Sequence, residues 1–487
     1  MSASSTDHSI SHFLQCRAYV DGQWLCNEQS ISVYNPATGN RIGDVPNLSA
    51  TTVQNAITAA RNAFPEWKRT TAQYRSKQLH ALCDLLLSRQ ESLAQLITLE
   101  NGKPLRESRR EVAYTASFIR WFAEEARRAY GEIIPSSSPH ERLFVQREPV
   151  GVCALITPWN FPLAMLGRKM AAALAAGCTI VAKPSELTPF SALALADLAS
   201  QMDFPAGSIN VVTGEPNRIG QIFCATPDVR KISFTGSTSV GRLLMRQSAE
   251  TIKKCSFELG GNAPFVVFED ADLEEAVQGA IASKFRNAGQ TCIASNRFLI
   301  EESIVPEFVE RLQTKLAALN VGNGFDEQTD IGPMIAPTAV HKIQRLLQHA
   351  LGLGAKLHLG SVPTESSLFV APIVLSGVSS EMNIWKEEIF GPVVSIASFQ
   401  TEEEALRMAN DTEYGLASYL YTSNAARIWR FSENLEFGMV GVNTGNISNA
   451  SIPFGGIKYS GFGREGGRQG LDEYLHTKYI RQQSRSL

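Results

Sequence analysis

Two residues with the chemistry of a nucleophile and a base stand 34 positions apart in this chain. Glu258 lies in the segment FELGG, and Cys292 lies in the segment GQTC. A thiolate attacks a carbonyl carbon, and a carboxylate can then activate water to cleave the resulting thioester. Glycines beside both residues let the backbone approach a ligand closely. Such a pair supplies a nucleophile and a base for one reaction, but by itself a glutamate or a cysteine means little, and a lone cysteine is usually inert core filler.

Four short motifs follow one another along the chain. They are PWNFP at 158–162, FELGG at 257–261, GQTC at 289–292 and EIFGP at 388–392. In this order, and over residues 15–480, they resemble the NAD(P)-dependent aldehyde dehydrogenase superfamily. The resemblance implies an α/β fold with a doubly wound parallel-sheet cofactor domain, an α/β catalytic domain and a small β oligomerisation element.

The composition sets limits on the class of protein. A chain of 487 residues exceeds the size of one growing core, so two or three domains are expected. With 44% hydrophobic residues, 19% charged residues and a net charge of −3, the chain is typical of a soluble globular protein. It shows no basic excess for nucleic acid or an anionic membrane. The longest largely apolar run, 170–182, is too short to span a bilayer.

The cysteines and the N-terminus indicate the compartment. None of the eight cysteines forms a Cys-x-x-Cys pair, and no His-Glu-x-x-His spacing occurs, so we expect neither a disulfide framework nor a metal site. This pattern fits a reducing cytoplasm. Residues 1–12 lack a signal-peptide pattern and are predicted to form a disordered tail.

The pattern of apolar residues predicts the organisation of the chain. Residues 51–128 are predicted to be helical, including a continuous helical pattern over 72–99. Strands and helices then alternate, which indicates a parallel, doubly wound sheet with ligands beyond its carboxyl ends. The predicted strands are 150–157, 179–182, 209–212, 231–234 and 263–267, with helices at 164–176 and 191–202. A second alternation, with a strand at 297–300 and a helix at 306–319, follows Cys292, and Gly and Pro punctuate residues 320–375.

The resemblance supplies domain limits that the pattern alone does not. It implies a NAD(P)-binding domain of residues 1–126 and 150–260 and a catalytic domain of residues 261–470. Residues 127–149 and 471–487 would form the oligomerisation element of a homotetramer or homodimer.

No Gly-x-Gly-x-x-Gly segment follows the first predicted strand, which argues against an ordinary dinucleotide fingerprint. The segment FTGSTSVG at 234–241 instead joins a strand to a helix start, where exposed N–H groups can bind phosphate. Taken alone, it is better interpreted as a capped helix after a glycine turn. In the family, the matching segment carries the cofactor pyrophosphate.

The choice between NAD and NADP depends on the segment KPSE at 183–186. In the family, the positions of Lys183 and Glu186 contact the adenosine ribose, and a carboxylate there accepts bonds from the ribose hydroxyls and repels a 2′-phosphate. We therefore expect NAD to be preferred and NADP to be possible, whereas the alternative is a solvated charged loop.

Glu388 matches the residue that holds the nicotinamide ribose, and Phe390, which could otherwise be plain core, lies beside the nicotinamide. The cofactor residues implied in total are Thr157, Pro158, Trp159, Lys183, Pro184, Ser185, Glu186, Gly220, Gly236, Ser237, Gly241, Leu259, Glu388 and Phe390.

The resemblance also assigns catalytic roles. Cys292 attacks an aldehyde, and the Asn160 amide with the Cys292 N–H donates to the oxyanion, each worth about 3–4 kcal/mol of the barrier. Glu258 activates the water that cleaves the thioester, and Lys169 relays a proton. The alternatives are a turn-forming Asn160 and a surface Lys169. Ala294 stands where several relatives have a second cysteine, so no disulfide switch is expected here.

Within the superfamily, the chain is most similar to succinate-semialdehyde dehydrogenases, through residues 283–289 and 442–448. Their substrate carboxylate is held at positions matching Arg168, Arg286 and Ser448, and arginine binds carboxylates through paired, charge-assisted bonds. The alternatives are that Arg286 complements a helix dipole and that Arg168 lies on a helix surface. Glutarate semialdehyde and a broad range of aldehydes remain open as substrates, because one methylene changes binding by only about 1–3 kcal/mol.

Two other classes of function stay open at this point. One is a cofactor-independent thioester hydrolase that uses Cys292 and Glu258. The other is a structural protein without catalysis, against which the intact Cys292, Glu258 and Asn160 argue.

Overall fold

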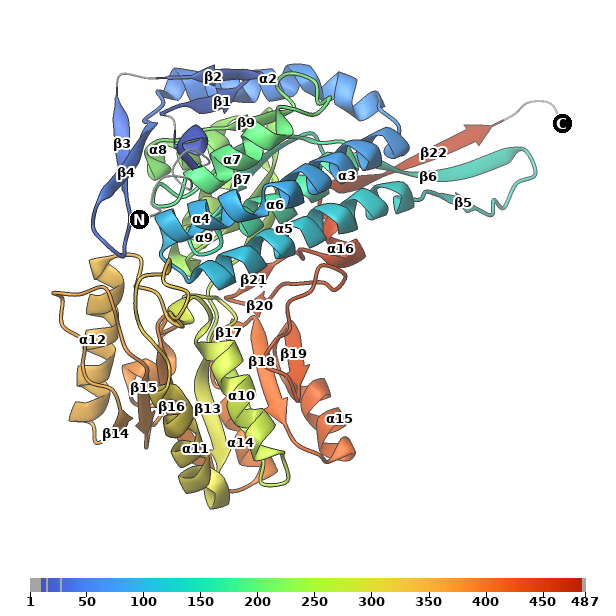
Figure 1. Ribbon diagram of the computed structural model, residues 1–487. Helices are drawn as coiled ribbons and strands as arrows, with labels where there is room; N and C mark the ends of the chain where they lie inside the picture. Colours follow the sequence, from blue (N-terminus) through green and yellow to red (C-terminus); the bar gives the residue numbers. More distant parts are fainter. Residues whose placement is uncertain (1–9, 15, 27–28, 484–487) are drawn as a thin grey trace.

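The computed structural model describes residues 10–14, 16–26 and 29–483. Two bodies, each built on a large β-sheet, lie one above the other, and a narrow antiparallel arm projects from the upper body (Figure 1). The fold class is therefore α/β, as predicted.

The first sheet has the order β2-β1-β9-β8-β7-β10-β11-β21. Its five central strands are parallel, and the edge strands β1, β2 and β21 pair antiparallel. The strands are β1 (Ala18–Val20), β2 (Gln23–Leu25), β7 (Val152–Ile156), β8 (Thr179–Lys183), β9 (Ile209–Val211), β10 (Val229–Thr235), β11 (Lys254–Glu258) and β21 (Gly461–Phe462).

Helices cover both faces of this sheet because alternate side chains of each strand point to opposite faces. Cys153 and Leu155 of β7 pack in a core with α3 to α7, whereas Val152 and Ala154 pack with α2, α8 and α9. The helices are α2 (Ala50–Arg69), α3 (Ala72–Ser88), α4 (Gln90–Asn101), α5 (Leu105–Glu125), α6 (Pro162–Ala176), α7 (Phe190–Ala199), α8 (Pro216–Ala225) and α9 (Thr238–Ser248).

Local sequence sets where these helices begin and end. The Ser49 and Thr71 side chains accept bonds from backbone N–H groups in the first turns of α2 and α3. Pro162 stands at the first turn of α6, where a missing N–H costs nothing, and Gly177 ends that helix with a left-handed φ of 95°.

The second sheet has the order β14-β15-β16-β13-β12-β18-β19, and only its edge strand β14 pairs antiparallel. The strands are β12 (Ala263–Val267), β13 (Ser295–Glu301), β14 (Lys356–Leu359), β15 (Ile373–Ser376), β16 (Val393–Phe399), β18 (Ala417–Tyr421) and β19 (Met439–Val442). Its helices are α10 (Leu273–Lys284), α11 (Val305–Ala317), α12 (Pro337–Gly352), α13 (Asn383–Lys386), α14 (Glu402–Asn410) and α15 (Ala425–Asn434). One apolar core joins this sheet to its helices.

The chain crosses from the first sheet to the second within residues 259–262, between β11 and β12, and returns at β21. Residues 461–462 thus pair with the first sheet, and α16 (Gly467–Asp472) packs on α5 and α6. The smaller elements are the pairs β3 (Ser30–Tyr34) with β4 (Arg41–Pro46) and β17 (Tyr414–Gly415) with β20 (Ile457–Lys458), and the 3-10 turns η1 (Ser11–Phe13), η2 (Ala126–Arg128), η3 (Ala249–Thr251), η4 (Arg286–Gly289) and η5 (Glu302–Ile304).

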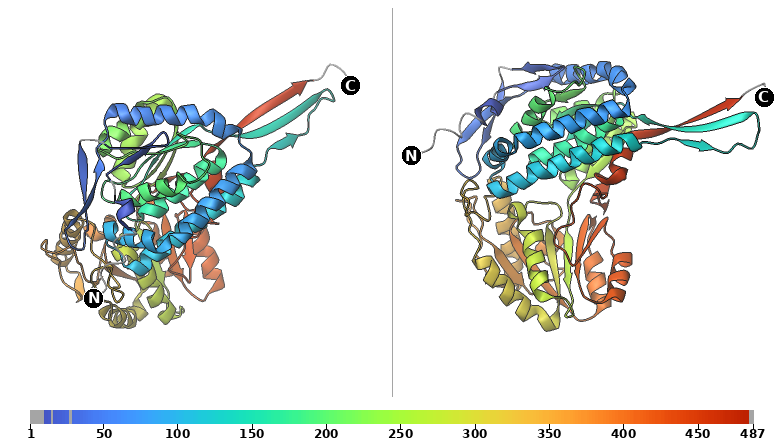
Figure 2. Two further views of the ribbon diagram at one scale, coloured as in Figure 1. Left: turned by 45° about the horizontal axis from the view of Figure 1, so that its top comes forward. Right: turned by 45° about the vertical axis from the view of Figure 1, so that its right-hand side comes forward.

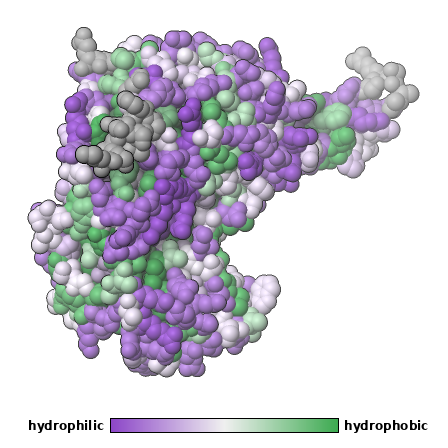
Figure 3. All heavy atoms as spheres, viewed as in Figure 1, coloured by the Kyte–Doolittle hydropathy of each residue, from purple (hydrophilic) through white to green (hydrophobic). Residues whose placement is uncertain are grey.

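The arm is a three-stranded antiparallel sheet built from two distant parts of the chain. β6 (Glu141–Pro149) lies between β5 (Glu132–Ile134) and the C-terminal β22 (Leu475–Gln483). It extends away from the body in all the ribbon views (Figure 2). Apolar side chains are exposed on it (Figure 3), with Ile133 at 75% and Tyr479 at 61%.

Some sequence predictions were wrong in detail. The helical pattern over 72–99 is two helices, because the chain breaks at Arg89. Of the predicted tail, residues 1–9 lie outside the described residues, but Ser11–Phe13 form a turn, and His12 contacts Asp197. None of the helices within the described ranges has the length and apolar character needed to cross a bilayer.

Candidate active site

Most of the residues predicted to bind the cofactor lie at or after the carboxyl ends of four neighbouring parallel strands. β8 ends at Lys183, β7 is followed by Thr157, β10 by Gly236, and β11 ends at Glu258. Because the strand order is β8-β7-β10-β11, these segments meet at one edge of the sheet. Ligands of doubly wound sheets bind at this edge.

The loop after β8 is held in a defined conformation. Lys183 is 5% exposed, and its Nζ donates to Glu186 Oε2 at 2.9 Å. The Thr157 N–H donates to the Lys183 carbonyl at 3.1 Å, and Ser185 Oγ accepts from the Leu187 N–H at 3.2 Å. Since Lys183 is buried, the alternative of a solvated charged loop is wrong for this residue, while Glu186 keeps 38% of its side chain exposed.

The start of α9 is a helix N-terminus open to solvent. Ser237 caps it by accepting from the Val240 N–H at 3.4 Å, and the Gly236 N–H donates to the Glu258 carbonyl at 3.0 Å. Gly241 is buried where a Cβ would lie 2.9 Å from Leu259 Cδ1. Gly220 is buried inside α8, where a Cβ would lie 3.5 Å from Leu244 of α9, so it lies between two helices rather than at a strand end.

Glu388 and Phe390 reach this edge from the second sheet. Glu388 Oε1 accepts from the Gly261 N–H at 2.9 Å, and burial raises the pKa of Glu388 to about 7. Phe390 has a left-handed φ of 56°, which is strained for a side chain of this size. Its half-buried ring meets the Trp159 ring edge-on, with centroids 5.6 Å apart, so it is not simply part of the core.

The Cys292 loop is fixed by the amides that precede it. Gln290 Nε2 donates to the Asn287 and Pro333 carbonyls at 3.1 and 3.3 Å, and its Oε1 accepts from the Ile335 N–H at 3.0 Å. Asn160 Nδ2 donates to the Gln290 carbonyl at 3.0 Å, and Asn287 Nδ2 donates to the Asn160 carbonyl at 2.9 Å. The structure therefore joins Asn160 of the first body to the loop that carries Cys292.

Burial controls the protonation of the two central groups. Burial raises the pKa of the Cys292 thiol to about 12, while the Arg168 charge acts to lower it. Burial, followed by the charge of Glu465, raises the pKa of Glu258 well above its ordinary value. Among the described residues, neither Glu258 carboxylate oxygen has a hydrogen-bond partner. Glu258 is therefore a buried carboxyl group with a strengthened affinity for protons.

Arg168 and Lys169 point into the molecule from α6. Each is 1% exposed, and both pair with Glu465. Lys169 Nζ also donates to Ser233 Oγ at 3.0 Å, and the Arg168 guanidinium lies 4.8 Å from the Phe454 ring. The alternative interpretation of both residues as helix-surface cations is therefore wrong.

A second buried network positions the loop of Asn160. Lys103 Nζ donates to Glu111 Oε2 and to the Asn160 carbonyl, both at 2.7 Å. Glu111 Oε1 accepts from the Leu163 and Ala164 N–H groups, at 3.0 and 3.2 Å, and so caps α6.

Sequence reasoning missed Glu111 and Glu465. One signal was present: α6 is apolar on every face except at Arg168 and Lys169, and buried cations require acidic partners. That signal does not say which acids they are.

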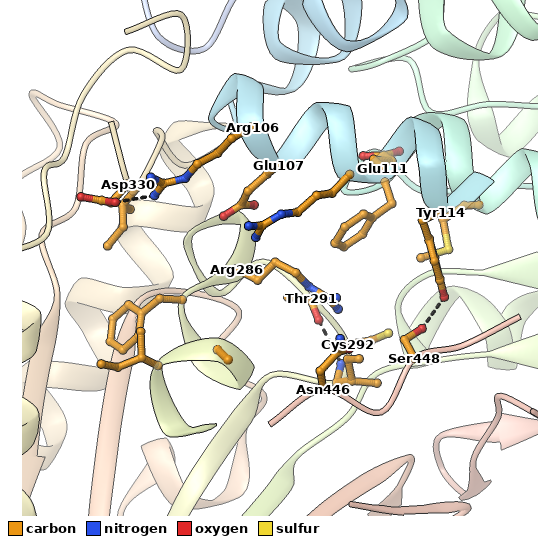
Figure 4. A pocket seen from close by; sticks show the side chains of 18 of the residues that line it. Arg106, Glu107, Glu111, Tyr114, Arg286, Thr291, Cys292, Asp330, Asn446 and Ser448 are labelled. Carbon is orange, nitrogen blue, oxygen red and sulfur yellow. Dashed lines mark hydrogen bonds and ion pairs between the residues drawn. The ribbon is translucent and has the colours of Figure 1, made fainter. Parts of the chain in front are cut away.

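The candidate substrate residues meet in one cavity. A cavity of about 650 Å³ is lined by Cys292, Arg168, Arg286 and Ser448. In Figure 4, Arg286 and Ser448 lie on either side of Cys292, beneath helix α5, from which Tyr114 reaches down to Ser448. Arg286 is half-buried beside the Phe161 ring, 5.3 Å away, and follows the C-terminus of α10. Within the described ranges, no cluster of acidic, histidine or cysteine side chains forms a metal site.

Asn160 is hydrogen-bonded to the loop that carries Cys292, and the charge of Glu258 acts on the Cys292 thiol, where the two bodies join. Residues 24–480 match the model of the aldehyde dehydrogenase family, and the chain belongs to that family.

Among its relatives is the glutarate-semialdehyde dehydrogenase of Pseudomonas putida, which is 50% identical over 95% of this chain and 97% of its own. The NADP(+) succinate-semialdehyde dehydrogenase GabD of Escherichia coli is 48% identical over 96% and 98%. The solved succinate-semialdehyde dehydrogenase of Burkholderia pseudomallei has 48% identity and a TM-score of 0.95, over 97% of this chain and 99% of its own.

Proposed function

We propose that this chain oxidises succinate semialdehyde to succinate with NAD(P)+, and that NAD+ is preferred. The observation that carries this proposal is the cavity in which Arg168, Arg286 and Ser448 accompany Cys292. Two guanidinium groups beside a nucleophilic thiol match a short aldehyde with a carboxylate at its other end.

Three residues have separate roles in the proposed reaction. Cys292 Sγ attacks the aldehyde carbon, and the Asn160 amide donates to the oxygen that becomes negative. One N–H of Asn160 Nδ2 donates to the Gln290 carbonyl. The second N–H of the same amide group remains available to donate to that oxygen. Glu258 then takes a proton from water, which cleaves the thioester on Cys292. Its raised pKa makes it a stronger base for that step.

Lys169 is suited to pass that proton onward. It pairs with Glu465, and the charge of Glu465 is the largest acting on Glu258. We propose that the proton leaves Glu258 through this pair.

The strand-end residues fit a dinucleotide. The open N-terminus of α9 offers N–H groups to a diphosphate, beside Gly236 and Ser237. Glu186 is exposed enough to accept bonds from ribose hydroxyls, and its carboxylate disfavours a 2′-phosphate. Glu388 and Phe390 would lie at the nicotinamide end. When bound, NAD(P)+ supplies the acceptor for the hydride that leaves the substrate carbon.

The chain limits and assembly are part of the same proposal. Residues 1–126 and 150–260 would form the NAD(P)-binding domain, 261–470 the catalytic domain, and 127–149 with 471–487 the oligomerisation element. The exposed apolar side chains of the arm support a homotetramer or homodimer. We propose a cytoplasmic enzyme that needs no metal.

The test is the rate of NADH or NADPH formation by the purified chain with each cofactor. The substrates are succinate semialdehyde, glutarate semialdehyde and butyraldehyde. The proposal expects kcat/KM to be highest for succinate semialdehyde with NAD+. A higher value for glutarate semialdehyde, the substrate named for one relative, would assign that aldehyde, which is one methylene longer, as the substrate. Equal values for butyraldehyde would leave a general aldehyde dehydrogenase, and ester hydrolysis without NAD(P)H formation would leave a thioester hydrolase.

A further inference from the structure

Tyr114, which lies outside the four motifs, lines the cavity that contains Cys292. Tyr114 lies on α5, is half-buried, and lines the cavity together with Arg168, Cys292 and Ser448. Its hydroxyl forms a hydrogen bond with Ser448 Oγ, across 334 positions of the sequence (Figure 4). Tyr114 therefore connects a helix of the first body to the loop that follows β19.

The tyrosine ring is fixed on its other side. The Phe118 ring, one helical turn further along α5, meets it edge-on with centroids 4.9 Å apart. A ring held in this way cannot turn its hydroxyl far from Ser448, so the position of Ser448 Oγ depends on Tyr114.

Tyr114 also lies within the electrostatic reach of Arg168. Burial acts to lower the pKa of Arg168, but Glu465 and then Tyr114 act to raise it, and the net direction is upward. The Glu465 pair occupies the Nε side of the guanidinium, and among the described residues Arg168 Nη2 has no hydrogen-bond partner. The unpaired Nη2 of Arg168 and the Tyr114–Ser448 pair thus belong to residues that line the same cavity.

Either hydroxyl of the Tyr114–Ser448 pair can be the donor of their hydrogen bond. A phenol is a stronger donor than an aliphatic alcohol, and each hydroxyl has one proton. Acidity favours the direction in which Tyr114 O–H donates to Ser448 Oγ, and that direction leaves the Ser448 O–H to donate to an anion. A donor that itself accepts a hydrogen bond is polarised and binds an anion more strongly.

We propose that Tyr114 is a specificity-determining positioning residue, which aims and polarises Ser448 toward the carboxylate of an acid-bearing aldehyde. This inference rests on the proposed function, because it assigns a partner to one of the groups that would bind the substrate carboxylate. Tyr114 contributes nothing to the carbonyl chemistry at Cys292, so its effect falls on the KM of anionic substrates.

The test compares wild type, Tyr114→Phe, Ser448→Ala and the double variant, with succinate semialdehyde and butyraldehyde under saturating NAD+. The substitution to phenylalanine keeps the ring packed on Phe118, and Tyr34→Phe, at an exposed tyrosine, is the matched control. We expect Tyr114→Phe to raise the KM for succinate semialdehyde about tenfold, as the loss of one hydrogen bond implies. Its kcat and its butyraldehyde kinetics should stay near wild type, and the double variant should be no worse than Ser448→Ala.

The outcomes separate the two proposals. If wild type prefers succinate semialdehyde and Tyr114→Phe keeps that preference within twofold, Tyr114 only lines the cavity. The inference about Tyr114 then fails, while the proposed function stands. Additive losses in the double variant, or equal losses on both aldehydes, would also overturn it. If wild type itself shows no preference for succinate semialdehyde over butyraldehyde, the proposed function fails and the inference fails with it.

Discussion

Replacing Glu465 with glutamine tests the charge balance beneath the cavity. Glu465 pairs with both Arg168 and Lys169, and the glutamine has nearly the same shape without the charge. The other acid of the cluster, Glu258, does not replace it, because among the described residues neither of its carboxylate oxygens has a hydrogen-bond partner. The substitution therefore leaves two buried cations without a compensating carboxylate.

The expected cost follows from this geometry. Removing one partner of a buried ion pair costs about 3–5 kcal/mol. Burial already lowers the pKa of Lys169, so this residue can lose its proton in the variant. The loss of stability should therefore lie near the lower end of that range, at about 3 kcal/mol. Each kcal/mol of lost stability lowers the melting temperature of a domain of 150–250 residues by about 2–4 °C, so a loss of about 3 kcal/mol should lower that of the variant by about 6–12 °C at pH 7.

The pH dependence has a defined sign. The two cations hold the pKa of Glu465 below its ordinary value in the folded state, although burial acts to raise it. Its stabilisation is thus fully present above the unfolded value of about 4.3 and is lost as the pH falls through the lower folded value. The difference from wild type should therefore be largest at pH 7 and shrink below about pH 4.

Thermal scanning of wild type, Glu465→Gln and the control Glu307→Gln at several pH values would measure this. Glu307 pairs with Arg311 on an exposed helix face, so its variant should melt within about 1 °C of wild type. A Glu465→Gln variant as stable as the control, or a difference that does not change with pH, would refute the reasoning.

Three further perturbations test the rest of the site. Arg286→Gln should lower kcat/KM for succinate semialdehyde by about 10–100-fold and spare butyraldehyde; equal losses on both would show a structural role. Alkylation of Cys292 in the free enzyme, followed by peptide mass mapping, should accelerate about tenfold per pH unit between pH 7 and 9, because its pKa of about 12 lies above that range; a plateau below pH 8 would contradict the raised pKa of this half-buried thiol. Glu186→Ser should raise the NADP/NAD ratio of kcat/KM about tenfold or more by removing the repulsion of a 2′-phosphate; an unchanged ratio would rule out Glu186 as the discriminating residue.

Local sequence patterns predicted the scaffold of the site but not its supporting charges. The strand that ends at Lys183 is marked by an apolar run that stops at a polar residue, a pattern within a few positions of the chain, whereas β11, which ends at Glu258, has no apolar run and was not predicted. Glu465 lies 296 positions from Lys169, and nothing near it signals a buried acid. Its role arises only when the chain after β20 returns to the first sheet. Pairings of this kind depend on tertiary contacts and not on periodicity.

The distances between interacting residues explain two other omissions. Tyr114 stands in an amphipathic helix, where an isolated aromatic residue is usually a packing residue. The three strands of the arm had no pattern of their own either, because β6 and β22 become a sheet only by pairing over more than 300 positions. The family resemblance supplied that pairing, and the amino-acid pattern alone did not.

The chain passes from the first sheet to the second within residues 259–262, so the proposed catalytic residues are divided between two bodies. Glu258, Asn160 and Arg168 belong to the body of the first sheet, and Cys292 belongs to the body of the second. Each body has its own apolar core. A nascent or damaged copy in which both cores have formed but have not met has the thiol without its amide, base and guanidinium partners. The proposed reaction therefore depends on the docking of the two bodies and not on the folding of either body alone.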